Sequence, residues 1–316
     1  MLQSINRIMN SIMAFFIPAC LIIGFFLTDQ LIGMSALIPW IFAFMTFSGS
    51  LNSSFSSFKG IVKHPRPLII TLVCLHIIMP LLAYGAGQLF YSDNQYTVTG
   101  IVLAMTIPAG ITSFVWVVIY HGNRTLTLAI ILISSLLSPF IVPFNLSILV
   151  GESVHIDSLQ IMEGLWWMVV FPSLLGMLFN SLMSKETIAK FDECLTPLTK
   201  FGLGFVVMLN GAVIAPYIKE EMNIELLFIG ITVFVIALSG YVLSYYIAKL
   251  TGQDKETIVS MTFSGGMRNI SAGAVLATTY FPPSAAVPVV IGMLFQQLCA
   301  TMFGKILDKR LHLLGD

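Results

Sequence analysis

The chain has 316 residues, of which 57% are hydrophobic and 9% charged, and its mean hydropathy is +0.93. Soluble domains carry about 25% charged residues, so this composition excludes an ordinary soluble protein and predicts an all-α protein that crosses a membrane many times. The 15 basic and 15 acidic residues cancel, so the net charge identifies no binding partner.

Ten apolar runs are long enough to cross a bilayer. About 20 helical residues are needed to cross about 30 Å of hydrocarbon, and short polar connections separate runs of that length here. The predicted spans are 8–28, 32–54, 67–91, 97–120, 124–149, 158–183, 196–217, 225–248, 256–281 and 284–306.

The basic residues predict the orientation of these spans, because cytoplasmic loops are enriched in Lys and Arg. The opposite connections hold Lys219, and Arg268 lies inside a span. We therefore expect a protein of the cytoplasmic membrane with both termini in the cytoplasm, which requires an even number of spans. The other 13 of the 15 basic residues lie on one set of alternate connections: Arg7, Lys59, Lys63, Arg66, Arg124, Lys185, Lys190, Lys200, Lys249, Lys255, Lys305, Lys309 and Arg310.

Ten spans divide into two sets of five, in residues 1–150 and 151–316. The connection 151–157 is predicted to lie outside, so the second set would enter the membrane from the opposite face. Transporters built from inverted repeats have this arrangement. The two halves share no strong residue-level identity, so the repeat is predicted from the pattern of spans alone.

The fourth span of each half is interrupted. The first interruption is Pro108-Ala109-Gly110-Ile111-Thr112-Ser113, and the second is Ser264-Gly265-Gly266-Met267-Arg268-Asn269. Each glycine lowers helix propensity by about 1 kcal/mol, and an arginine at mid-span costs roughly 2.5–3.5 kcal/mol on insertion scales. Both helices should therefore break there and turn their open backbone to a cavity. Matching interruptions are the best sequence indication of a transporter binding site.

Each interruption should produce a half-helix that begins near mid-membrane, at 111–114 and at 268–271. Unpaired N–H groups and the helix dipole make such ends attractive to anions. Arg268 adds a guanidinium that stays charged and suits carboxylate, sulfate or phosphate. Three roles for Arg268 remain open: it hydrogen-bonds carbonyls of the other broken helix, it replaces a coupling cation, or it contacts the substrate.

Several other polar or aromatic side chains could face this centre. Asn210 and Thr127 are further candidates for lining the cavity, and Phe114 and Trp116 could stack on an apolar substrate. No Asp or Glu lies at mid-span, so the sequence offers no buried carboxylate to carry a proton. It also shows no nucleotide loop, metal-ligand cluster, catalytic pair or nucleic-acid patch, so no enzyme, metal, cofactor or nucleic-acid partner is expected. The predicted substrate-binding residues are Thr112, Phe114, His76, Arg268, Asn269, Ser271, Gln296 and Gln297.

Short motifs along nearly the whole chain resemble one family. They include Pro65-Arg66-Pro67, Met79-Pro80, Pro108-Ala109-Gly110, Gly266-Met267-Arg268-Asn269 and Gln296-Gln297, together with Gly49-Ser50-Leu51, Phe55, Phe58 and Gly122-Asn123. In this order and spacing the chain resembles the bile acid:sodium symporter family, particularly its bacterial ten-helix members.

The resemblance implies a core domain (67–149 and 225–306) and a panel domain (8–54 and 158–217), with the two broken helices crossing in the core. An amphipathic organic anion would bind between core and panel, and relative movement of the two would give alternating access. Bile acids, pantoate-like acids, sulfated steroids and other small carboxylates all remain possible substrates.

The sodium ligands of that family match this sequence only in part. Its serine in the fourth span matches Ser113, but the asparagine that follows is Phe114, and a hydroxyl in the fifth span matches Thr127. The glutamate shared by both sodium sites falls on Ser264, and a nearby glutamine falls on Arg268.

The glutamine that the family has in the third span falls on or next to Leu75 and His76.

One carboxylate with two sodium ions carries the same single positive charge as one guanidinium. This favours the hypothesis that Arg268 stands permanently in place of sodium and that transport is not sodium-coupled. The alternatives are a sodium symporter with rearranged ligands and a membrane protein that binds or regulates without transport.

Overall fold

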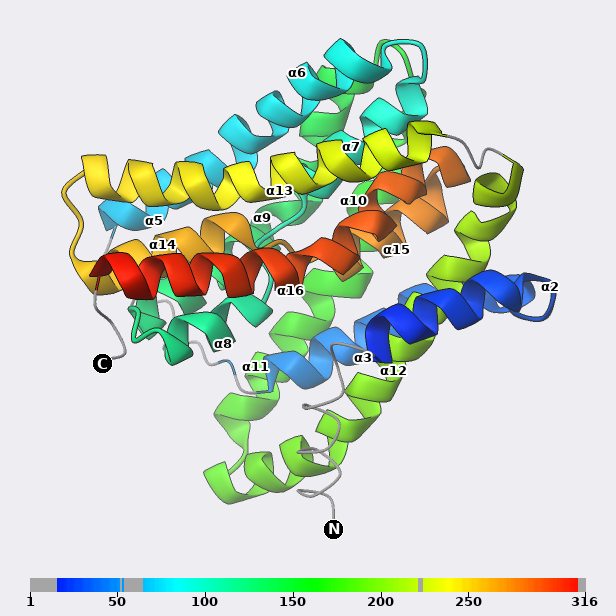
Figure 1. Cartoon of the computed structure of the whole chain (residues 1–316). Helices are drawn as coiled ribbons and strands as arrows, with labels where there is room; N and C mark the ends of the chain where they lie inside the picture. Colours follow the sequence, from blue (N-terminus) through cyan, green and yellow to red (C-terminus); the bar gives the residue numbers. More distant parts are fainter. Residues whose placement is uncertain (1–15, 52, 54–64, 221–223, 312–316) are drawn as a thin grey trace.

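The computed structural model describes residues 16–51, 53, 65–220 and 224–311. Figure 1 shows a bundle of helices. Within the described residues the only β-type pairing is an isolated antiparallel bridge between Ala109 and Arg268. The predicted all-α class is confirmed for this part of the chain.

Seven helices of the described chain are long and apolar enough to cross a membrane. Three of them contain a 3-10 or π-helical piece. In chain order they are α2–η1–α3 (Thr28–Leu31, Ile32–Leu37 and Ile38–Ser50), α5–η3–α6 (Pro65–Val73, Cys74–Ile78 and Met79–Tyr91), α9 (Arg124–Val150), α10–η4–α11 (Ser158–Leu165, Trp166–Val170 and Phe171–Leu182), α12 (Lys185–Glu220), α13 (Ile224–Leu250) and α16 (Pro283–Leu311).

The remaining apolar helices are shorter. Helix Phe16–Phe26 falls in the first predicted span, of which residues 8–15 lie outside the described part. The other short helices form two consecutive pairs, α7 (Gln95–Thr106) with α8 (Thr112–Ile119) and α14 (Lys255–Gly266) with α15 (Ile270–Tyr280). These pairs are the two interrupted spans. The total of ten spans and the inverted repeat remain predictions.

The second interruption lies in the second half of the predicted stretch 264–269. Helix α14 continues through Gly265 and ends at Gly266, and α15 begins at Ile270. A side chain on Gly265 would collide with Ser244, and one on Gly266 would collide with the ring of Tyr241. The glycines therefore let α14 pack closely on α13, as small residues commonly do between membrane helices.

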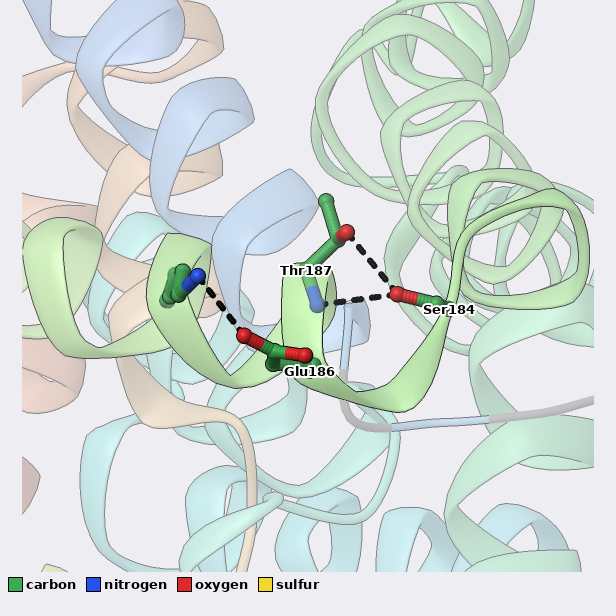
Figure 2. A network of polar contacts seen from close by, with 4 residues as sticks. Ser184, Glu186 and Thr187 are labelled. Atoms are coloured by element: carbon green, nitrogen blue, oxygen red, sulfur yellow. Dashed lines mark hydrogen bonds and ion pairs between the residues drawn. The ribbon is translucent and has the colours of Figure 1, made fainter.

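Helix α12 extends well beyond the predicted span 196–217 at its start, because its first turns are polar yet still helical. Figure 2 shows how this end is held: the Thr187 backbone N–H donates to Ser184 Oγ at 3.2 Å, and the two hydroxyls lie 2.9 Å apart. Lys190 Nζ also pairs with Glu186 Oε1 at 2.8 Å across one helical turn. A serine that accepts from the third residue of a helix is a typical N-cap.

Helix α3 packs on α11 and α12, whereas α13 packs on α14 and α16, and α7 packs on α16 and α6. In Figure 1, α13 and α16 run side by side, and α3 lies against α12. Helices of the expected panel also pack on helices of the expected core, α10 on α9 and α12 on α16. The division into panel and core therefore remains a prediction.

Gly100 provides a test of the packing between α7 and α16. A side chain there would collide with the backbone carbonyl of Ala285, and overpacking costs typically 1–3 kcal/mol. We expect Gly100→Ala to lower the thermal unfolding midpoint of the purified protein in detergent. Gly85→Ala is the matched control, because nothing lies within 4 Å of that position. Equal destabilisation by both variants would contradict this packing.

Candidate functional site

The two interrupted helices meet at their breaks. The Gly110 N–H donates to the Met267 carbonyl at 3.0 Å, and the Asn269 N–H donates to the Pro108 carbonyl at 2.8 Å. These hydrogen bonds form the antiparallel bridge between Ala109 and Arg268. The breaks therefore satisfy part of each other's open backbone inside the protein, and we refer to residues 107–111 and 267–269 as the crossing.

Gly110 within the crossing and Ser134 beside it allow the two breaks to pair closely. A Cβ atom on Gly110 would lie 2.6 Å from the Arg268 carbonyl oxygen, so only glycine allows the two chains to approach this closely. Ser134, on α9, accepts a hydrogen bond from the Ala109 N–H at 3.2 Å and donates to the Ile131 carbonyl at 3.0 Å. The sequence analysis missed Ser134, because a single serine in an apolar helix carries no signal of its partner.

Both second half-helices begin at the crossing. Helix α8 begins at Thr112 and α15 at Ile270, within the predicted ranges 111–114 and 268–271. Asn269 caps α15, since its Oδ1 accepts from the Ala272 N–H at 3.4 Å. The first turns of the two helices bring partial positive charge to the same place.

A cavity of about 210 Å³ lies beside the crossing. Its walls come from α3, α8, η4, α9, α11, α12, α15, α16 and the crossing. No Asp, Glu, Lys or His lines it among the described residues. The polar residues that line it are Thr46, Ser50, Ser53, Thr112, Ser135, Ser173, Arg268, Asn269, Ser271 and Gln296. The large apolar side chains that line it are those of Phe42, Met45, Ile111, Leu128, Ile131, Leu132, Val169, Met177, Leu203 and Ile270.

Five of the eight predicted substrate-binding residues line this one cavity. They come from three helices and the crossing: Thr112 begins α8, Asn269 and Ser271 lie at the start of α15, Gln296 lies on α16, and Arg268 lies in the crossing. Gln296 Nε2 is 3.5 Å from Thr112 Oγ1, which ties the two walls together.

The other three predicted substrate contacts, Phe114, His76 and Gln297, do not line the cavity. Gln297 is exposed, and its Oε1 accepts from the Trp116 indole at 3.3 Å. His76 is buried. As substrate contacts these residues remain predictions that the cavity does not support.

Trp116 and Asn210 also lie away from the cavity walls. The Trp116 ring stacks on Tyr120 and Phe263 at centroid distances of 6.2 and 5.9 Å, so its faces pack within the protein. The buried Asn210 accepts a hydrogen bond from Thr278 at 3.3 Å.

Arg268 is 3% exposed, and its Nη1 donates to the Leu75 carbonyl at 3.2 Å. That carbonyl is free because of Pro80. In the π-helical turn η3 the Met79 N–H donates to the Cys74 carbonyl, and proline has no N–H to offer the next one. The acceptor of Arg268 is therefore in η3 and not in the other broken helix, which corrects the first of the three expected roles.

The same turn exposes a second carbonyl, that of His76. Asn145, on α9, donates its Nδ2–H to this oxygen at 2.8 Å. Asn145 was also missed from sequence, although Pro80 indicates that a carbonyl four residues earlier needs another donor. Arg268 and Asn145 thus each donate to a carbonyl of η3.

The residues at the family's cation positions form a neutral set. Ser113, Thr127 and Ser264 are fully buried, and Thr127 donates to the Asn123 carbonyl at 3.1 Å. The hydroxyls of Ser113 and Ser264 have no partner among the described residues. None of these three residues is a carboxylate, and Ser264 lies in the same interrupted span as the buried Arg268. The set therefore supplies no negative charge to compensate a buried cation.

Interrupted helices that meet beside a lined cavity, in a bundle of apolar spans, define a membrane transporter. The model of the Sodium Bile acid symporter family matches residues 39–221, and the chain belongs to this family. It is a multi-pass transporter of the sodium/bile-acid type and not an enzyme.

Three relatives illustrate the range of similarity. "Uncharacterized protein YbaS" of Bacillus subtilis (strain 168) is 50% identical over 294 residues, covering 92% of this chain and 95% of the relative. "Uncharacterized sodium-dependent transporter YocS" of the same organism is 26% identical over 289 residues, covering 92% and 88%. "Probable sodium/metabolite cotransporter BASS1, chloroplastic" of Arabidopsis thaliana is 24% identical over 255 residues, covering 79% and 60%.

Ser134 offers a test of how the crossing is held. Ser134→Ala removes the acceptor of a buried backbone N–H, which costs about 1–3 kcal/mol, so we expect a lower thermal unfolding midpoint in detergent. Ser138→Ala is the matched control, because this buried serine on the same helix donates only within α9, to the Ser135 carbonyl. If the two variants melt alike, Ser134 does not support the crossing.

Proposed function

We propose that the chain carries a small organic anion across the membrane by alternating access, with the anionic group bound at the crossing. One observation carries this proposal: the first turns of α8 and α15 both line the same cavity. The partial positive charge of these helix starts attracts an anion, and the hydroxyls of Thr112 and Ser271 and the amide of Gln296 are donors suited to a carboxylate.

The charges around the cavity favour an anion over a cation. No carboxylate lines it among the described residues, so a cationic substrate would have no counter-charge. Arg268 supplies positive charge from within the crossing. Because its side chain is bonded to the Leu75 carbonyl and almost fully buried, we assign it an electrostatic role and not direct substrate contact.

We further propose that Arg268 takes the place of a coupling sodium ion. Its guanidinium is held by a carbonyl of η3, at the residues where the resemblance sets the glutamine of the second sodium site. A permanent charge would leave nothing for sodium to neutralise and would keep the crossing competent for an anion at all times. Transport would then depend on the substrate gradient alone.

The larger arrangement follows the same proposal. Helices α3, α11 and α12 would form part of a panel, and α5–α9 with α13–α16 a core, with the cavity between them. Movement of one set against the other would open the cavity to alternate sides of the cytoplasmic membrane, with both termini in the cytoplasm.

Sodium-coupled symport is the second candidate. The printed names of two relatives, the sodium-dependent transporter YocS and the sodium/metabolite cotransporter BASS1, favour it. In that case the buried hydroxyls of Ser113, Thr127 and Ser264 would contribute to an ion site with rearranged ligands.

Replacing sodium distinguishes the two candidates. We expect cholate, gluconate and 2,3-dihydroxyisovalerate, tested one by one, to include at least one anion that raises the thermal midpoint equally in sodium chloride and in choline chloride. Arg268→Gln should weaken that binding by about tenfold or more, because the nearby positive charge, which attracts an anion by roughly 1–4 kcal/mol inside a protein, is lost.

Arg124→Gln is the matched control, since this arginine is exposed at the start of α9, and it should leave binding unchanged. Strict dependence of binding on sodium in the wild type would contradict the built-in cation and leave symport as the function.

A further inference from the structure

The cavity beside the crossing extends toward one side of the membrane. Its lining residues on α3 lie in the second half of that helix and continue to Ser53, and those on α9, within 128–135, lie in the first half of that helix. Lys59 follows the end of α3 and Arg124 begins α9, so these are the predicted cytoplasmic ends of both helices. The cavity therefore leads from the crossing toward the predicted cytoplasmic side.

On the opposite side of the crossing, helices of the expected panel and core are in contact. Helices α10 and α12 pack on α15. A Cβ atom on Gly164, in α10, would collide with the hydroxyl and ring of Tyr280, the last residue of α15. Thr278, also on α15, donates to Asn210 Oδ1, on α12, at 3.3 Å. We refer to Gly164, Asn210, Thr278 and Tyr280 as the outer contact.

The outer contact is closely packed but incompletely hydrogen-bonded. Asn210 is fully buried, and its Nδ2 has no hydrogen-bond partner among the described residues. A buried donor without a partner is unfavourable, and water would satisfy it if α12 and α15 separated. Thr278 also donates to the Ala274 carbonyl at 2.8 Å, so its hydroxyl would stay paired after separation. Opening the contact therefore gives up packing and gains hydration of one amide.

We propose that the outer contact is the gate that closes the outer side of the substrate path, and that this structure is the state open to the cytoplasm. In the opposite state, Tyr280 would leave Gly164 and the Asn210 amide would meet water. This inference rests on the proposed alternating access, but its test requires no substrate.

A cysteine in the cavity reports which side is open. The reporter is Ser271→Cys, at the start of α15, in a protein whose exposed native thiol is removed by Cys194→Ser. The rate of labelling by a membrane-impermeant maleimide is measured in everted and in right-side-out vesicles. We expect fast labelling in everted vesicles, where the reagent reaches the cytoplasmic side, and slow labelling in right-side-out vesicles, where only the minor outward-open state reacts. Cys194→Ser alone gives the background rate.

Two variants that spoil the fit of Tyr280 should open the gate. Gly164→Leu fills the space that the ring occupies, and Tyr280→Ala removes the ring. Changes of this kind in a packed contact shift an equilibrium by about fivefold to a hundredfold, so both variants should raise labelling from the outside by about fivefold or more. Gly85→Leu is the matched control and should leave labelling unchanged, because this glycine is exposed on α6 and has nothing within 4 Å.

Asn210→Leu should act in the opposite direction. It removes the unpartnered buried amide and replaces it by an apolar side chain of similar size, so the closed gate becomes more stable. Labelling from the outside should fall by about fivefold, while labelling from the cytoplasmic side stays fast. General destabilisation would raise labelling from both sides and so cannot imitate this result.

The outcomes separate the gate from the proposed function. Faster labelling in right-side-out than in everted vesicles overturns the assignment of the open side. Outside labelling that stays at the wild-type rate in Gly164→Leu and Tyr280→Ala overturns the gate, and a rise in Asn210→Leu removes Asn210 from it. Each of these results leaves the anion binding of the sodium experiment untouched. If none of the three anions binds there while labelling is one-sided, the proposed substrate class fails and the gate stands.

Discussion

The backbone pairing at the crossing is the constraint on which the rest of the structure depends. Unsatisfied N–H and C=O groups cost several kcal/mol each in hydrocarbon, so a helix can be interrupted inside a membrane protein only where the open backbone finds partners. Here each break supplies partners for the other, through the bonds from Gly110 to Met267 and from Asn269 to Pro108. This pairing puts two helix starts beside one cavity.

The same requirement explains the neighbouring polar contacts. Pro80 has no N–H to offer the carbonyls of η3, and the side chains of Arg268 and Asn145 donate to two of them, those of Leu75 and His76. Ser134 does the same for the Ala109 N–H. A charge that would be costly alone is thus placed where a carbonyl needs a donor. The hydrogen bond from Arg268 to the Leu75 carbonyl thus both holds a positive charge near the cavity and supplies a donor to η3.

Much of this arrangement could be predicted from the sequence, because hydrophobic run length, proline and glycine act locally. The positions of both interruptions and the starts of α8 and α15 followed from Pro108, Gly110 and Arg268 themselves. The donors Thr112, Ser271 and Gln296 were candidates because polar groups at mid-span are rarely exposed to lipid. The packing role of Gly265 and Gly266 could not be predicted, since their close approach to Ser244 and Tyr241 depends on a helix elsewhere in the chain.

The sequence by itself determined the class of protein, the places where two helices break and the absence of mid-span carboxylates. Only the tertiary structure decided that Phe114, His76 and Gln297 do not line the cavity, that Arg268 is bonded to the Leu75 carbonyl, and which distant helices share one cavity. The physical reason is that helix formation and membrane insertion depend on neighbouring residues, whereas the direction of a buried side chain and the volume of a cavity depend on contacts between residues far apart in the chain.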